Sequence, residues 1–192
     1  MSFVRYSTEF LPEASFADPT NVQMRFAAMM EADLPGFVVR AAGNDIEEVT
    51  ARLQESVGAD YPFGSREQNH AAFIFCDRST DGLGLHVDSD PLRTKDQTRI
   101  NVHLTTRGSV VASLFTPKPS TGKWGYYDWR KLSYSDSDNC IDDFAVIPVE
   151  HRAEIAPQDL LVFTSRRHAH AFRSTATPRW SAVNVFHVPN RT

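Results

Sequence analysis

The short stretch LHVDSD, residues 85–90, places a histidine and an aspartate two positions apart. Alternate side chains of a β-strand point to opposite faces, so His86 and Asp88 share one face while Leu85 and Val87 share the other. An imidazole and a carboxylate on one face can coordinate a metal ion. The alternative is an ordinary polar face in contact with solvent. The pair therefore indicates a metal site only if the chain supplies a third ligand.

A second group of polar residues lies between positions 165 and 186, in SRRHAHAFRSTATPRWSAVNVF. His168 and His170 fall on one face of a predicted strand, and Arg179 and Ser181 follow on the next. We expect a hairpin that makes His170 and Arg179 near neighbours in one sheet. Two imidazoles and one carboxylate on one face of a metal leave three positions open, as in non-haem Fe(II) oxygenases. An arginine fork beside them suits the carboxylate of a co-substrate, and a serine hydroxyl adds a second donor.

The elements that must position these residues follow from the spacing of apolar side chains. Helical spacing predicts two amphipathic helices, at residues 21–32 and 44–57, and Asn44 or Asp45 can cap the second. From His70 onward the period changes to two, in short β-rich runs separated by Gly, Pro, Asp and Ser. Many short strands after two helices predict a mainly β fold, a β-sandwich or jelly roll, with the helices packed outside it.

One segment without a clean period, residues 118–149, interrupts this pattern. Long loops inside compact domains are usually functional lids or disordered, and the aromatic content of this one argues against plain disorder. We expect a single domain over residues 1–192, in which a helical and irregular part, 1–69, packs on a β core, 70–192, that carries the segment as a lid-like insertion. The substrate contacts expected in the lid are its large aromatic residues, Trp124, Tyr126, Tyr127 and Trp129.

Taken together, these motifs give the sequence a resemblance to the Fe(II)/2-oxoglutarate-dependent dioxygenase superfamily. The resemblance covers residues 73–188 and includes PQDLLVF at 157–163, in which Gln158 replaces the more usual glycine. It implies a double-stranded β-helix that holds one Fe(II). The residues that carry it are His86, Asp88 and His170 as metal ligands, with Arg179 and Ser181 on the co-substrate.

The resemblance also implies a reaction. It predicts an oxidoreductase that uses O₂ to decarboxylate 2-oxoglutarate to succinate and hydroxylates a small molecule, such as an amino acid or a natural-product intermediate. Desaturation, epoxidation and ring formation stay open as outcomes. Two other functions also stay open. One is a hydroxylase of protein side chains, suggested by the prolyl-hydroxylase-like spacing of His170 and Arg179. The other is a cupin-like jelly-roll metal protein without 2-oxoglutarate turnover.

Three assignments around the predicted site have alternatives. His168 competes with His170 as the distal ligand because both share a face. In the strand TRINVHLTT, Asn101 and His103 either point into the interior, where the family contacts 2-oxoglutarate or substrate, or face water. Arg93 either contacts an anionic substrate or is simply solvated.

Composition and charge limit the classes of partner that we expect the chain to bind. The chain of 192 residues has a formal net charge of −4 and contains no long Lys/Arg block, which argues against nucleic acid. No apolar run approaches the ~20 residues that a spanning helix needs, and the start of the chain does not read as a secretory signal. Cys76 and Cys140 form no Cys-x-x-Cys motif, as in reduced cytoplasmic proteins. We expect a cytoplasmic enzyme with a small-molecule substrate, and a homodimer stays open.

Overall fold

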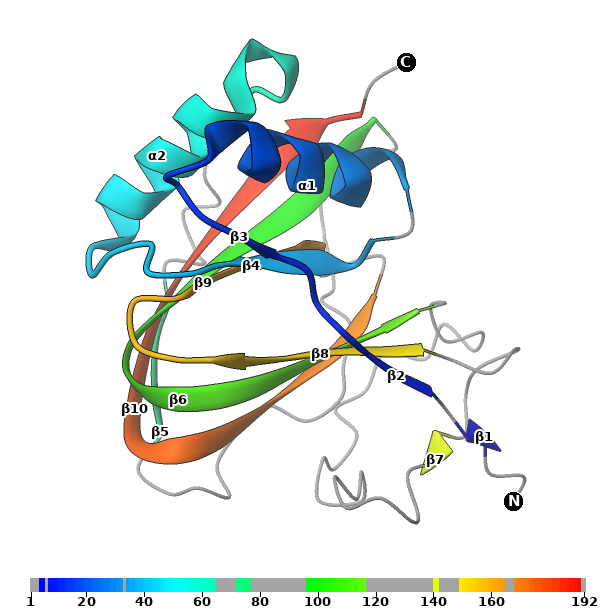
Figure 1. Ribbon diagram of the computed structural model, residues 1–192, viewed down its shortest axis with the longest axis vertical. Coiled ribbons are helices and arrows are strands. Elements are labelled where there is room, and N and C mark those ends of the chain that lie inside the picture. The colour runs from blue at the N-terminus through cyan, green and yellow to red at the C-terminus, as the bar shows by residue number, and fades with distance from the viewer. Residues whose placement is uncertain are drawn as a thin grey trace.

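A curled β-sheet with two helices on one side makes up the chain in the computed structural model (Figure 1). The structure describes residues 4–5, 7–32, 34–64, 72–76, 96–116, 140–141, 149–164 and 168–190. The helices are α1 (Pro19–Glu31), α2 (Ile46–Val57) and a 3₁₀ turn, η1 (Gly58–Asp60). The strands are β1 (Val4–Arg5), β2 (Ser7–Phe10), β3 (Glu13–Ala14), β4 (Gly36–Val39), β5 (Ala72–Cys76), β6 (Gln97–Thr116), β7 (Cys140–Ile141), β8 (Val149–Ile155), β9 (Leu160–Thr164) and β10 (Ala169–Pro189).

Two long strands, β6 and β10, organise the sheet. They pair antiparallel along most of their length, from Gln97 opposite Pro189 to Phe115 opposite Ala169. The first half of β6 also pairs with β9, whereas its second half pairs with β8. Each long strand therefore belongs to two layers, and the sheet folds back on itself as Figure 1 shows. We call the layer with β9, β4 and β3 the upper layer, and the layer with β8 and β2 the lower layer.

The fold-back depends on a glycine in β6. Gly108 has φ +69°, in the left-handed region that favours glycine. A Cβ at this position would lie 2.3 Å from the carbonyl oxygen of Ala176 on the neighbouring strand. The register of β10 shifts opposite this point, between Ser174 and Ser181. A side chain at position 108 is thus excluded by the same close approach that bends the two strands together.

Apolar side chains fill two regions on opposite faces of the upper layer. The helices cover its outer face, where Phe26 of α1 and Leu53 of α2 are buried with Ile100, Val102 and Leu104 of β6. A second cluster fills part of the interior between the layers. Its residues include Val38, Leu161 and Phe163 from the upper layer and Val110, Ala112, Leu114, Ala153 and Phe172 from the lower layer.

The predicted fold class is confirmed: the fold is a mainly β jelly roll with flanking helices. Both predicted helices form, and Asp45 is the cap of α2, because its Oδ1 accepts hydrogen bonds from the backbone of Glu47 at 2.8 Å and Glu48 at 3.1 Å. The predicted lid-like insertion, 118–149, lies almost wholly outside the described residues, so the domain organisation stays a prediction. In the described part of the chain, no helix has the length and apolar character to cross a membrane.

Candidate functional site

A row of polar side chains lines the interior face of the upper layer. On β6, the apolar residues at 100, 102 and 104 pack toward the helices, so Arg99, Asn101, His103 and Thr105 point the other way. These four side chains are buried, between 0% and 7% exposed. Of the two orientations left open for Asn101 and His103, the structure has the interior one, and neither residue faces water.

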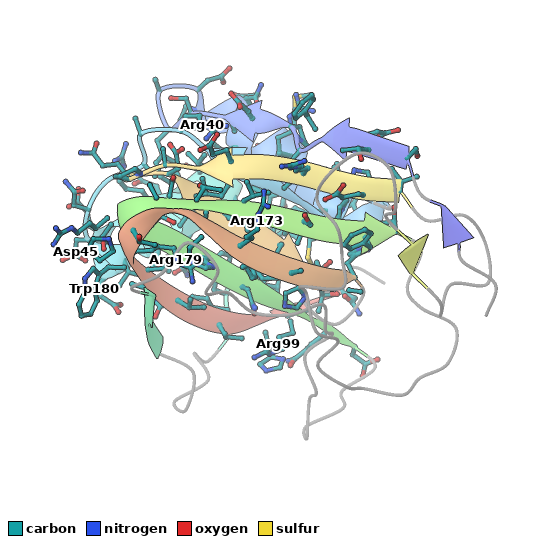
Figure 2. All side chains as sticks on the ribbon, turned by 90° about the horizontal axis from the view of Figure 1, so that it is seen from below. Arg40, Asp45, Arg99, Arg173, Arg179 and Trp180 are labelled. Atoms are coloured by element: carbon teal, nitrogen blue, oxygen red, sulfur yellow. The ribbon has the colours of Figure 1, made fainter. Side chains whose placement is uncertain are left out.

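The neighbouring strand adds two more polar residues to this face. Ser181 of β10 lies opposite Thr105, with 3.5 Å between their hydroxyl oxygens. Arg179 stands two residues earlier, opposite Cys76 of β5, and its side chain is 0% exposed. Figure 2 shows Arg179 close to the bend of the long strands. A guanidinium stays protonated when buried, so a permanent positive charge lies inside the sheet.

The lower layer contributes a second histidine. The ring of Phe172 lies 5.0 Å from the ring of His103 and 5.8 Å from that of His170, which places both imidazoles against one aromatic side chain. Phe163 of β9 packs edge-on against His170 at 4.9 Å. We call His103, His170, Arg179 and Ser181 the interior cluster.

His103 is the most perturbed titratable group of this cluster. Burial, the largest cause, and the positive charges of Arg179 and His170 together lower the pKa of His103 to about 3. The ring is therefore neutral at neutral pH. Its Nε2 atom is buried and makes no hydrogen bond within the described part of the chain. An uncompensated buried polar atom costs about 1–3 kcal/mol, so it needs an explanation.

His170 and His168 differ in where their rings lie. The Nδ1 of His170 is 3.2 Å from the carbonyl oxygen of His168, so Nδ1 carries a proton that it donates to that oxygen. The Nδ1 of His168 instead lies 3.3 Å from the carbonyl oxygen of Phe115. His170, the histidine preferred from the sequence, is the one that packs with the interior cluster.

The predicted hairpin between His170 and Arg179 is wrong. Both residues belong to the single strand β10, which continues past the Ser-Thr-Ala-Thr-Pro stretch and stays paired with β6. The turn-forming residues at this point mark register shifts rather than a reversal of the chain. Both side chains lie near His103, because the strand curls from the lower layer into the upper one.

Several predicted site residues lie outside the described residues: His86, Asp88, Arg93, Trp124, Tyr126, Tyr127 and Trp129. Their assignments stay predictions. Arg99 and the aromatic residues Phe163 and Phe172 were not among the predicted site residues, although they belong to this interior. The alternation in β6 could have identified Arg99, since it shares a face with Asn101 and His103. No local signal in the sequence pairs the two phenylalanines with the histidines.

Comparisons with solved structures find, among other matches, the following three proteins. The dTDP-4-dehydrorhamnose 3,5-epimerase of Bacillus anthracis, solved with TDP and PPi bound, matches with a TM-score of 0.36 and 11% identity, over 72% of this chain and 59% of its own. The same enzyme from Elizabethkingia anophelis matches with a TM-score of 0.33 and 12% identity, over 68% and 51%. RmlC from Streptococcus suis, in complex with dTDP-D-xylose, gives 0.32 and 10%, over 64% and 44%.

The likeness concerns the fold alone. The chain spans about half the length of the solved structures that it matches. A scan against known protein families finds no match, and no curated protein matches the sequence either. Because one fold hosts many activities, function has to be argued from the site.

The comparisons contradict the predicted function. The matched structures are named as epimerases, so the predicted Fe(II)/2-oxoglutarate-dependent oxygenase is wrong, as is the protein-hydroxylase alternative. The predicted use of Fe(II), 2-oxoglutarate and O₂ is contradicted as well. Within the described ranges, no group of three or more His, Cys, Asp or Glu could hold a metal ion. The comparisons do not test the individual roles predicted for His170, Arg179 and Ser181, which stay predictions from the sequence.

Proposed function

We propose that the chain binds a small organic anion at the interior cluster and exchanges a proton with it. The observation that carries this proposal is the buried Nε2 of His103, which makes no hydrogen bond with any described residue. The lone pair of a neutral imidazole nitrogen can accept a hydrogen bond or a proton from a ligand. Buried titratable groups with strongly shifted pKa values are typical of functional sites.

The charge of Arg179 determines what kind of ligand fits. Its buried guanidinium attracts carboxylates and phosphates and can bind either with two parallel hydrogen bonds. The hydroxyls of Ser181 and Thr105 stand on the same interior face as further donors. Phe172 gives the same space an apolar wall beside both histidines. An organic anion uses both the charged and the apolar parts of this surface, whereas an inorganic anion uses only the first.

An anion beside Arg179 also changes what His103 can do. The positive charges of Arg179 and His170 help to hold the pKa of His103 down. A bound negative charge opposes them and raises that pKa, so the ring gains a proton more readily when ligand is present. His103 then acts as a base toward the ligand, and the proton is returned to the ligand in the same site. Removal of a proton from one atom and its return to another atom, or to the opposite face of the same atom, is isomerisation without net oxidation.

Calorimetry with three proteins tests the binding part. Carboxylates, phosphates and nucleoside-diphosphate sugars are titrated into the wild type, Arg179→Gln and Arg107→Gln. Arg107 is exposed on β6 and is the matched control. We expect binding of at least one organic anion to the wild type and the control, and affinity at least about tenfold lower in Arg179→Gln. A wild type that binds none of these anions contradicts the proposal.

Deuterium exchange tests the chemistry. A ligand found by calorimetry is incubated with the protein in D₂O, and loss of its carbon-bound proton signals is followed by NMR. The wild type should exchange a ligand proton for deuterium, and His103→Gln should bind the ligand but exchange it far more slowly. Binding without exchange in the wild type would identify a binding protein in place of an enzyme.

A further inference from the structure

A second buried arginine lies on the same interior face as the interior cluster. Arg99, near the start of β6, is 2% exposed, and it stands directly opposite His187 of β10. Figure 2 shows Arg99 farther along the sheet from the bend than Arg179. The interior face of the upper layer therefore has a permanent positive charge toward each end.

The surface between the two arginines is polar on one strand and apolar on the other. On β6, Asn101 and His103 continue the face that begins with Arg99. Their partners across the strand pair are Val185 and Val183 of β10. Side chains on one strand face repeat every second residue, so this polar edge runs along β6 without a break. An elongated molecule lying along the strands would meet donors and acceptors on one side and methyl groups on the other.

We propose that the ligand of the interior cluster is elongated and carries two anionic groups, one held by Arg179 and the other by Arg99. This inference rests on the proposed function and adds the class of ligand to it. Arg99 stands opposite His187, and Arg179 lies eight positions before His187 on β10, which is roughly 26 Å along the strand at about 3.3 Å per residue. The two anionic groups must therefore be several bonds apart, with a chain or ring between them.

The test uses ligands of graded length. Straight-chain dicarboxylates of increasing length, the monocarboxylates of equal length and the corresponding bisphosphates are titrated by calorimetry. In the wild type, the affinity for dicarboxylates or bisphosphates should rise with length and exceed that for the matched monoanion by at least about tenfold at the optimum. The series that binds shows whether the anionic groups are carboxylates or phosphates.

Variants assign the second anionic group to Arg99. Arg99→Gln should bind the optimal dianion no more tightly than the monoanion, while its affinity for the monoanion stays within about twofold of the wild type. Arg99→Lys keeps the charge and should retain most of the preference for the dianion. Arg107→Gln, the exposed control on the same strand, should match the wild type.

The outcomes separate this inference from the function on which it rests. Equal affinity for monoanions and dianions at every length in the wild type overturns the inference and leaves the proposed function standing. A preference for dianions that survives in Arg99→Gln overturns it as well. Failure of every anion to bind the wild type contradicts the proposed function itself. The dependence of affinity on ligand length is measured on the wild type, so it tests the inference even if Arg99→Gln does not fold.

Discussion

The ring of His103 lies 5.0 Å from the ring of Phe172, and this contact joins the upper layer to the lower layer inside the sheet. His103 comes from the first half of β6, and Phe172 comes from the first half of β10. The imidazole thus occupies a place in the interior where an apolar side chain would pack equally well. Its presence there costs stability in the folded protein, and the cost depends on pH.

Acid should destabilise the protein through His103. Its pKa is about 3 when folded, against its ordinary value of 6.5, so the unfolded state binds more protons between these values. The stability associated with neutral His103 is complete above about pH 6.5 and is lost as the pH falls from there toward about 3. At about pH 5.5 the loss is about 1.4 kcal/mol. Urea unfolding at about pH 7.5 and 5.5 should show this loss in the wild type and not in His103→Leu. The same pH dependence in both proteins would refute the assignment.

The bend at Gly108 can be tested against a second glycine with nearly the same φ. Gly108 and Gly58 have φ +69° and +68°, but a Cβ at Gly58 would meet nothing within 4 Å. Gly58→Ala should therefore cost only the backbone strain, about 1–2 kcal/mol. Gly108→Ala adds a clash with two backbone carbonyls of β10, so it should cost at least about 2 kcal/mol more than the control. Equal losses of unfolding free energy in denaturant titrations would show that the bend tolerates a side chain.

A buried carboxylate fixes the turn before β9. Asp159 accepts hydrogen bonds from the backbone of Ala41 at 3.1 Å and Ala156 at 3.0 Å, and from Nη1 of Arg40 at 2.5 Å. Asp159→Asn replaces one accepting oxygen by a donor, so it should lower the unfolding free energy by at least about 2 kcal/mol. Glu13 binds the other side of Arg40, but it is 58% exposed. Glu13→Gln should cost at most about 1 kcal/mol. Chemical denaturation of both variants measures the difference, and a larger loss in Glu13→Gln would contradict it.

The position of Gln158 favours glycine. Gln158 is exposed with φ +73°, in the left-handed region, and its carbonyl oxygen accepts a hydrogen bond from the backbone of Ala42 at 2.7 Å. Gln158→Gly should raise the unfolding free energy by up to about 1 kcal/mol, since the relief of strain exceeds the entropy that glycine gains on unfolding. Gln158→Val should lower it, because a β-branched residue fits this conformation worst. Thermal unfolding checks the order; a valine variant as stable as the glycine variant would disprove it.

The helices and the orientation of β6 could be predicted because their signals are local. The buried residues of α1, Val22, Phe26, Met29 and Met30, follow the helical spacing from which this helix was predicted. In β6, strict alternation separated the helix-facing residues from the interior row, and both faces are occupied as expected. Periodicity reports which residues share a face, and this is all that such assignments require.

Strand β8 and the course of β10 could not be predicted in the same way. VEHRAEI, the sequence of β8, reads as a polar segment, yet Glu150 is 2% exposed. Its carboxylate is buried because Ser113 and Thr8 of the neighbouring strands donate hydrogen bonds to it, at 2.6 Å and 3.0 Å. Such partners depend on strand pairing, which no local pattern shows. The proximity of His103 to His170 and Arg179 depends on the same long-range pairing of strands.

The predicted function was wrong for another reason, because the residues did not determine the reaction. The residues singled out as co-substrate contacts, Asn101, His103, Arg179 and Ser181, are all buried, and on β6 and β10 the paired strands bring them to one interior face. What the residue types could not specify was the chemistry, because imidazole, guanidinium and hydroxyl groups serve oxygenases and isomerases alike. The spacing of a motif identifies neighbours more reliably than it identifies a reaction.

The pairing of β6 with β10 also sets how the chain has to fold. The contact between His168 and Phe115 spans 53 residues of sequence, and the contact between Thr98 and Asn190 spans 92. Closing loops of this size costs chain entropy before any of the paired strands is stabilised. Proteins dominated by such distant pairings fold in milliseconds to seconds rather than microseconds. Refolding should therefore be slow, and the two ends of the described core should form their contacts last.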